Sequence, residues 1–205
     1  MKKTFFQRTY NLNANLIVLA LLSFFLKIGI NLLIQMIETT KISGMQGLFT
    51  TIIDKLTVLE YYIQLLSFCL ILVPALLVII ELVQRFRSDS ISNYFKSIFQ
   101  TIRFRHFLKQ DEKIEAVSDK DNQTTKTGFD PIIQSFNNSI SKCTIDVRNS
   151  SVSVVMQYPK TQQAQKILRE MTEQIKEEIS SYNPGYIFSA PTREGDKLWF
   201  KATRV

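Results

Sequence analysis

The sequence predicts a membrane-embedded helical hairpin followed by a small soluble domain of the α+β class. Within the 205 residues, two long apolar stretches predict the hairpin, at 16–37 and 61–83. Each has about the 20 residues that a helix needs to cross the hydrocarbon of a bilayer. From residue 84 onward the composition is mixed, with periodic apolar positions, as in a domain that folds in water.

The distribution of charge predicts how the hairpin is inserted. Basic residues gather before the first span and after the second, and acidic residues predominate between the spans. Positive residues are retained on the cytoplasmic side. We therefore expect a multi-pass protein of the cell (inner) membrane with both termini cytoplasmic. Its expected segments are a basic N-terminus at 1–15, spans at 16–37 and 61–83, and an extracytoplasmic loop at 38–60. A cleaved signal peptide is disfavoured because no small-x-small pattern follows the first apolar run.

Polar side chains inside the spans are costly, so their positions carry information. They recur on one stripe of each helix: Ser23, Lys27, Asn31 and Gln35 in the first, and Gln64, Ser67 and Glu81 in the second. The stripe is compatible with packing within the hairpin, assembly with partner helices, or a transport route. Depth matching of the spans predicts that Asn31 meets Ser67 and Gln35 meets Gln64. It places Lys27 near the Leu70 carbonyl, which Pro74 leaves without a donor.

The segment 84–109 follows the second span directly and predicts an amphipathic helix. Its apolar positions have helical spacing: Ile91, Tyr94, Phe95, Ile98, Phe99 and Ile102. Its basic residues are Arg85, Arg87, Lys96, Arg103, Arg105 and Lys109. This combination predicts a helix in the headgroup layer of the anionic inner leaflet. Packing on the soluble domain and contact with nucleic acid are the alternatives.

The segment 110–128 is polar and predicts a flexible linker, and the domain proper is expected at 129–205. A helix should begin at Asp130-Pro131, because a cap followed by proline is a strong helix start. Alternating β-branched residues predict a hairpin of strands. A long amphipathic helix and a second hairpin follow. The expected bounds are strands at 143–148 and 152–158, a helix at 161–182, and strands at 186–190 and 198–205. This order predicts an antiparallel sheet with helices on one face.

The last strand offers the best candidate binding surface. Leu198 and Phe200 point to one side of the sheet, while Lys197, Trp199 and Lys201 point to the other, which is expected to be open. A tryptophan between lysines suits a protein partner, and Arg148 could extend the surface. Single-stranded nucleic acid is a less favoured ligand, since only one aromatic residue is available for stacking. The alternative structural interpretation is that Trp199 closes the edge of the core.

Catalytic and metal-binding chemistry has little support in the sequence. There is a single histidine, and the two cysteines fall in different environments, one in the second span and one in the domain. The six glycines form no phosphate-binding loop. We therefore expect no enzymatic activity, no cofactor and no metal.

These observations favour a non-enzymatic bacterial membrane protein whose cytoplasmic domain recruits a protein partner, or a second copy, at the inner membrane face. The layout of two spans, a short outer loop and a cytoplasmic body is similar to the membrane end of a conjugative coupling protein. That resemblance implies an accessory subunit of a secretion or DNA-transfer complex. Two alternatives stay open: an immunity protein that acts through its hairpin, and a small transporter subunit that depends on Lys27 and Glu81.

Overall fold

The computed structural model describes residues 1–39, 46–110 and 130–205, which form two compact units. One unit is the hairpin, Arg8–Glu81, and the other combines Met1–Gln7 with Leu82–Val205. The expected linker at 110–128 lies, apart from Gln110, outside the described residues. The α+β domain therefore includes the first seven residues of the chain, which were expected to form a separate tail.

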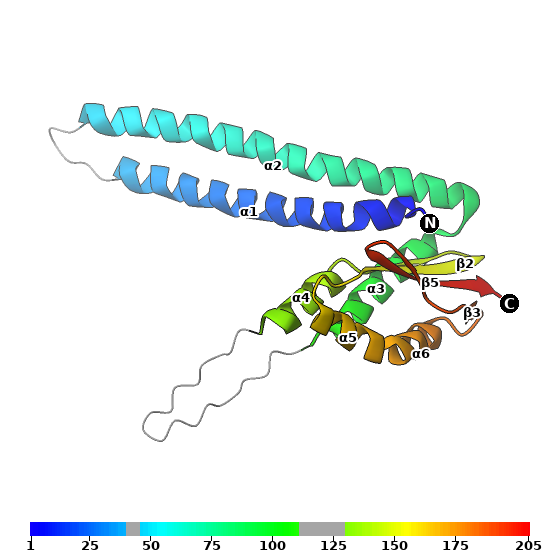
Figure 1. Ribbon diagram of the computed structural model, residues 1–205. Coiled ribbons are helices and arrows are strands. Elements are labelled where there is room, and N and C mark those ends of the chain that lie inside the picture. Colours follow the sequence, from blue (N-terminus) through cyan, green and yellow to red (C-terminus); the bar gives the residue numbers. More distant parts are fainter. Residues whose placement is uncertain (40–45, 111–129) are drawn as a thin grey trace, which may run out of the picture. The chain divides into compact units, whose positions relative to one another are not determined.

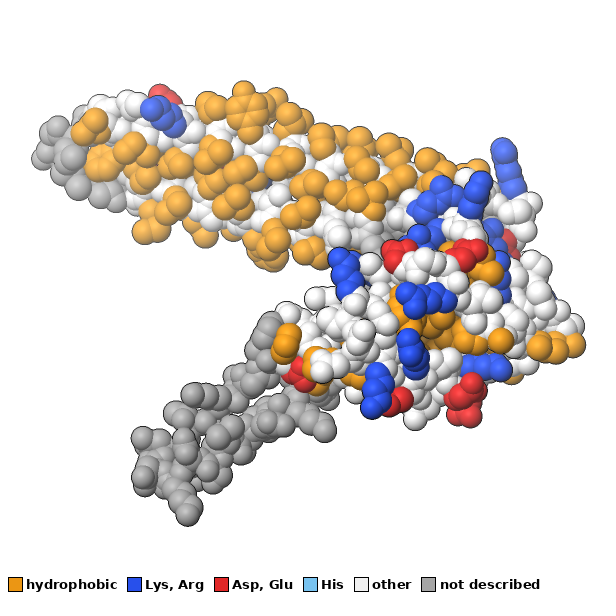
Figure 2. All heavy atoms as spheres, in the orientation of Figure 1, with side chains coloured by type: hydrophobic (Ala, Val, Ile, Leu, Met, Phe, Trp, Pro, Cys, Tyr) orange, Lys and Arg blue, Asp and Glu red, His pale blue; other side chains and the backbone are white. Residues whose placement is uncertain are grey.

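The hairpin consists of two long apolar helices, α1 (Phe5–Thr39) and α2 (Gln46–Ser88), drawn in blue and cyan to green in Figure 1. Both are long and apolar enough to cross a membrane, and their most apolar stretches are largely exposed. Apolar side chains are spread along the visible surface of these helices (Figure 2). The two helices are thus compatible with a two-span membrane protein. Helix α2 begins at Gln46, so part of the expected outer loop is helical.

The domain contains an antiparallel sheet of five strands (Figure 1). The strand order is β1-β2-β5-β3, and β4 pairs with the other half of β5. The strands are β1 (Thr144–Val147), β2 (Ser151–Gln157), β3 (Tyr186–Phe188), β4 (Thr192–Glu194) and β5 (Lys197–Arg204). Four helices accompany the sheet: α3 (Ile91–Leu108), α4 (Pro131–Ile140), α5 (Gln162–Glu170) and α6 (Thr172–Tyr182).

One face of the sheet forms the main core with these four helices. In the register of the strands, Val154 lies between Ile145 and Phe200, and all three side chains are fully buried. The helices contribute Phe104 and Leu108 from α3, Phe136 and Ile140 from α4, Ala164 and Leu168 from α5, and Ile175 and Ile179 from α6. This arrangement confirms the predicted combination of an apolar hairpin and a small α+β domain with an antiparallel sheet.

Local signals predicted several elements well. The Asp130 side chain accepts hydrogen bonds from the backbone N–H groups of Ile132 and Ile133, and Pro131 occupies the first helical position of α4. The expected long helix at 161–182 is instead two helices that meet at Met171, whose ψ of −5° departs from helical geometry. The apolar stripe nevertheless continues across the break, because Leu168 and Ile175 are both buried in the core.

Candidate docking surface on the outer face of the sheet

The outer face of the sheet is the one predicted to be open, and most of its central strands are covered. Trp199 is 2% exposed and its cross-strand partner Val155 is 1% exposed. The expectation that Trp199 is displayed on an open face was therefore wrong. The alternation of side chains along β5 correctly placed Trp199 and Phe200 on opposite faces of the sheet. Alternation does not show, however, what covers each face. The indole Nε1–H has no hydrogen-bond partner among the described residues.

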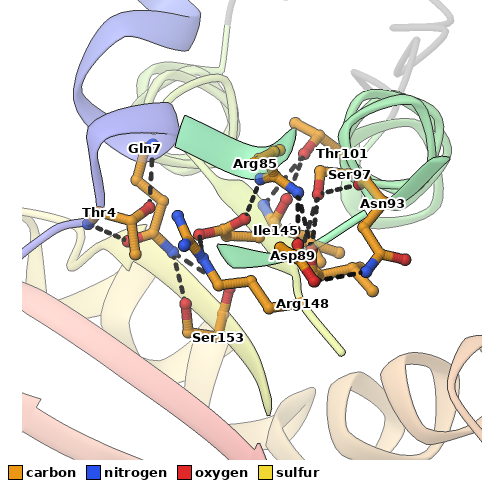
Figure 3. Close-up of polar contacts among 12 residues, drawn as sticks. Thr4, Gln7, Arg85, Asp89, Asn93, Ser97, Thr101, Ile145, Arg148 and Ser153 are labelled. Atoms are coloured by element: carbon orange, nitrogen blue, oxygen red, sulfur yellow. Dashed lines mark hydrogen bonds and ion pairs between the residues drawn. The ribbon is translucent and has the colours of Figure 1, made fainter. Parts of the chain in front are cut away.

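The chain segment before the first span provides part of this cover. Gln7 Nε2 donates hydrogen bonds to the backbone oxygen of Ser153 on β2, at 3.1 Å, and to its Oγ, at 3.0 Å (Figure 3). Phe6 is 2% exposed and its ring packs edge-on against Tyr94, with centroids 5.7 Å apart. The first residues of α1 thus belong to the packing of the domain.

The last turns of α2 supply the second part of the cover, through a buried ion-pair cluster. The Arg85 side chain is 0% exposed and forms an ion pair with Asp146 of β1. Arg85 also donates to the Val147 backbone oxygen, at 3.0 Å, and lies 3.4 Å from Asp89. Arg148 pairs with the second oxygen of Asp146, at 3.0 Å (Figure 3).

This cluster changes the roles expected for two basic residues. Arg85 was assigned to the membrane surface, but its guanidinium is committed to the domain interior, so that assignment was wrong. Arg148 was expected to extend the binding surface, and it is only partly exposed because it helps to neutralise Asp146. Buried charges persist in proteins when they are paired in this way.

A hollow remains on the outer face, beside the covered part. It has a volume of about 270 Å³ and is lined by Lys2 and Thr4 of the N-terminal segment and by Trp199 and Lys201 of β5. The lining also includes the hydroxyl-bearing residues Ser151, Ser153 and Thr203, together with Val152 and Ala202. Lys2 and Lys201 are both exposed. The hollow therefore offers two ammonium groups and several hydroxyl groups, a combination suited to carboxylates.

Further lysines lie near Lys3, the residue between the lining residues Lys2 and Thr4. Burial lowers the pKa of Lys3, and the nearby positive charges of Lys197 and Lys142 lower it further, whereas Asp196 opposes the shift. Lys197 is partly exposed and lies 3.9 Å from Asp196. The structure thus places Lys201 beside Lys2 in the hollow and Lys197 near Lys3, so each predicted lysine has a neighbour from the opposite end of the sequence.

Helix α3 buries several polar side chains, whereas a helix that packs on an ordinary core buries mainly apolar ones. Its polar side chains Asn93, Ser97 and Thr101 are buried. Ser97 Oγ accepts a hydrogen bond from the Val147 N–H, at 2.9 Å, and Thr101 Oγ1 accepts one from the Ile145 N–H, at 3.0 Å. These bonds satisfy the free edge of β1, which otherwise lacks a neighbouring strand.

The basic residues of this region divide into two groups. Arg105 donates through Nε to the Cys143 carbonyl, at 2.7 Å, so part of its capacity is used inside the domain. The Arg103 guanidinium carbon lies 4.4 Å from the centre of the Tyr182 ring, and Arg103 is exposed. Arg87, Lys96 and Lys109 are also exposed. Four of the six basic residues predicted for the membrane surface are therefore accessible.

In the hairpin, the two polar stripes meet, but in a different register from the predicted one. Lys27 Nζ donates to Gln64 Oε1, at 3.1 Å, rather than reaching toward Leu70. Gln35 bonds Asn31 along its own helix. The prediction paired residues by their distance from the ends of the two apolar runs. The helices extend beyond these runs, and α2 already begins at Gln46, so the ends of the runs do not set the register.

The other stripe residues take different positions. Ser23 and Ser67 each donate to the carbonyl four residues earlier in their own helix. Ser67 and Glu81 are buried. Among the described residues, no three His, Cys, Asp or Glu side chains gather in a way that could hold a metal ion.

Sequence reasoning missed Phe6, Gln7 and Lys2 as parts of the domain. Their segment is short and continuous with an apolar helix, so no periodicity separates it from the span. The only available signal was two adjacent phenylalanines, Phe5 and Phe6, in an otherwise basic and polar tail. Comparison with known proteins adds no information about this site: no family model, curated protein or solved structure matches the chain.

Proposed function

We propose that this protein is a non-enzymatic bacterial inner-membrane protein whose cytoplasmic domain recruits a protein partner through an acidic segment of that partner. The observation that carries the proposal is the hollow between the N-terminal segment and β5. Lys2 and Lys201 line it from opposite ends of the sequence, and Lys3, which follows Lys2, lies near Lys197. Complementary charge steers association and selects among partners.

The two chain segments that form the domain support the proposed orientation in the membrane. The domain unit contains both Met1–Gln7 and the chain from Leu82 onward, and Gln7 is hydrogen bonded to Ser153. Both ends of the hairpin therefore contribute to one folded body, as expected when two spans return the chain to its starting side. Together with the basic flanks, this favours cytoplasmic placement of both termini. The layout resemblance makes a secretion or DNA-transfer complex the setting in which we place the partner.

Site-specific photo-crosslinking in cells tests the recruitment function. A photoreactive phenylalanine analogue replaces Thr203, an exposed residue that lines the hollow, and a control analogue replaces Lys166, which is 79% exposed on α5. We expect a partner with an acidic segment to be captured from position 203 and not from position 166. The Lys2→Glu variant should abolish this capture, whereas the matched Lys166→Glu variant should not. Capture that is indifferent to Lys2→Glu would contradict the proposal.

An immunity function that acts through the hairpin is the second candidate. It is favoured by the Lys27–Gln64 hydrogen bond and by a hollow of about 300 Å³ on the hairpin, lined by Phe24, Lys27, Asn31 and Glu60 among others. Polar groups in a span commonly mark a functional contact. The Lys27→Leu variant separates the two functions. Loss of a membrane-protein partner in Lys27→Leu, with no change in Lys2→Glu, would favour the hairpin function.

A further inference from the structure

The outward face of α3 is an apolar surface of the domain unit that the packing of the domain does not explain. Its large side chains are highly exposed: Ile91 at 40%, Phe95 at 62%, Phe99 at 65% and Ile102 at 58%. The opposite face carries Ser97 and Thr101, which are fully buried. Contiguous exposed apolar residues on a folded domain mark a surface that contacts something else.

The buried face of α3 prevents the helix from turning its phenylalanines inward. Ser97 and Thr101 hold the backbone N–H groups of Val147 and Ile145, and Arg105 holds the Cys143 carbonyl. Rotation of the helix would leave these edge groups of β1 unpaired and buried, which is unfavourable. The apolar face is therefore fixed outward by the fold.

The position of α3 in the chain favours a bilayer as the occupant of this face. Helix α2 ends at Ser88, and α3 begins at Ile91. From Val83, the end of the apolar run, to Ser88 the helix rises by about 8 Å. This length is comparable with the headgroup layer on one side of a bilayer, about 5–8 Å. The first turn of α3 thus starts where an interfacial helix should start.

Charge distribution also favours a bilayer, and one with anionic lipids. Lys96 and Arg103 are exposed on α3, and Arg87 and Lys109 are exposed at its two ends. Acidic residues are absent from α3 itself, whose sequence is ISNYFKSIFQTIRFRHFL. A helix with an aromatic face and only basic charges is typical of segments that lie in the plane of an anionic membrane surface.

We propose that α3 is an interfacial helix whose Phe95–Phe99 face is seated in the anionic inner leaflet while its polar face closes the β1 edge of the sheet. The helix then has two partners at once, lipid on one side and the sheet on the other. This inference rests on the two-span assignment of the hairpin and is independent of the docking hollow.

Fluorescence quenching in reconstituted full-length protein tests the proposal. Single cysteines replace Phe99 and, as a control, Ile187, in a Cys69→Ala background in which the remaining native Cys143 is buried. Ile187 is a matched position because it is apolar, is 66% exposed, and lies on β3, at the opposite edge of the sheet from β1. Each cysteine carries an environment-sensitive NBD label in vesicles of phosphatidylcholine with or without phosphatidylglycerol.

We expect the label at position 99 to be quenched by a nitroxide attached near the lipid headgroups and to be protected from aqueous iodide. The label at position 187 should behave in the opposite way. Adding phosphatidylglycerol should increase the lipid quenching at position 99, and a Lys96→Glu, Lys109→Glu double variant should lose that increase. Unchanged Trp199 emission in each variant shows that the domain is still folded.

Other outcomes overturn the proposal in identifiable ways. Iodide quenching at position 99 equal to that at position 187 would place the face in water. Protection from both quenchers would mean that protein covers it, either a second copy or a partner. A third label at Phe68, 62% exposed in α2, separates these results from failure of the two-span assignment. Lipid quenching at 68 without lipid quenching at 99 would overturn the α3 proposal alone.

Discussion

Single buried residues decide how tightly the hairpin ends are joined to the sheet. Arg85 is the clearest case, because its guanidinium pairs with Asp146 and Asp89 and also bonds a strand carbonyl. A charge of this kind is expensive to bury and is tolerated only while its partners remain. Arg85 thus acts as a structural residue, although its position in the sequence resembles that of a topology signal.

We predict that Arg85→Ala destabilises the domain by about 3–5 kcal/mol, because the buried Asp146 loses its buried arginine partner and keeps the partly exposed Arg148. The matched Arg87→Ala variant removes an exposed basic residue from the same turn and should cost less than about 0.5 kcal/mol. Urea unfolding of the detergent-solubilised full-length protein, followed by the emission of its single tryptophan, measures both values. Equal losses in the two variants would show that Arg85 is not buried.

Cys143 provides a second test at the residue scale. Burial raises the pKa of its thiol to about 12, and the opposing effect of the Arg105 charge is smaller. Because the thiolate is the reactive form, Cys143 should resist maleimide and iodoacetamide at pH 9 in the folded protein and react after denaturation. Mass spectrometry of the Cys69→Ala variant measures this. Rapid labelling of the folded protein would mean that the thiol is accessible.

The same shift has a definite sign for stability. A thiol whose pKa is higher in the folded state contributes stability that is fully present below its unfolded pKa, near 9. That contribution is lost as the pH rises from about 9 toward about 12, because only the unfolded chain releases the proton in that range. A Cys143→Ala variant should therefore lose less stability than the parent protein over this alkaline range.

At the scale of elements, α3 takes the place of an additional strand beside β1. Ser97 and Thr101 hold two N–H groups of the strand edge. A helix rarely satisfies an edge, because its own backbone groups are already used within the helix. Here short hydroxyl side chains at a four-residue spacing do so, since they line up with alternate residues of the strand.

We predict that Ser97→Ala and Thr101→Val each destabilise the domain by about 1–3 kcal/mol, the cost of leaving a buried N–H group without an acceptor. Ser92→Ala, on the exposed side of α3, is the matched control and should be close to neutral. Hydrogen exchange of the Val147 and Ile145 amides provides a local reading. Unchanged protection in the Ser97→Ala and Thr101→Val variants would show that the edge is held by other groups.

For α3, the sequence predicted the helix and its apolar face but not what its polar face packs against. Helical spacing found the face with Phe95 and Phe99 and the helix that carries it. Spacing also predicted the core positions Leu168 and Ile175, although nothing in the sequence marks the break at Met171 between them. Which neighbour a polar face meets depends on strand order, and strand order is a property of the folded chain. The cover over Trp199 was missed for the same reason.

At the scale of the whole molecule, the domain depends on residues that precede the first span. Phe6 is 2% exposed, and the Arg85 guanidinium lies 5.4 Å from the centre of its ring. Gln7 is bonded to Ser153 across 146 positions of sequence. The hairpin is therefore flanked on both sides by parts of one folded unit rather than by a tail and a domain.

We predict that Phe6→Ala lowers the stability of the domain by about 3–5 kcal/mol, the usual cost of removing a buried aromatic ring. Trp199 emission should shift to longer wavelength if the N-terminal segment detaches, because the indole would become hydrated. Phe86→Ala removes a phenylalanine that is 76% exposed and is the control. An unchanged stability and emission spectrum in Phe6→Ala would show that the segment does not cover the sheet.

The contact between Gln7 and Ser153 also fixes an order of events during synthesis. The ribosome makes the N-terminal segment first, and β5, on which Trp199 lies, last. Until β5 has emerged, Phe6 and Gln7 have no completed sheet to pack against, although both spans have already been made. The contact of Phe6 and Gln7 with the sheet can therefore form only after both hairpin helices have been made.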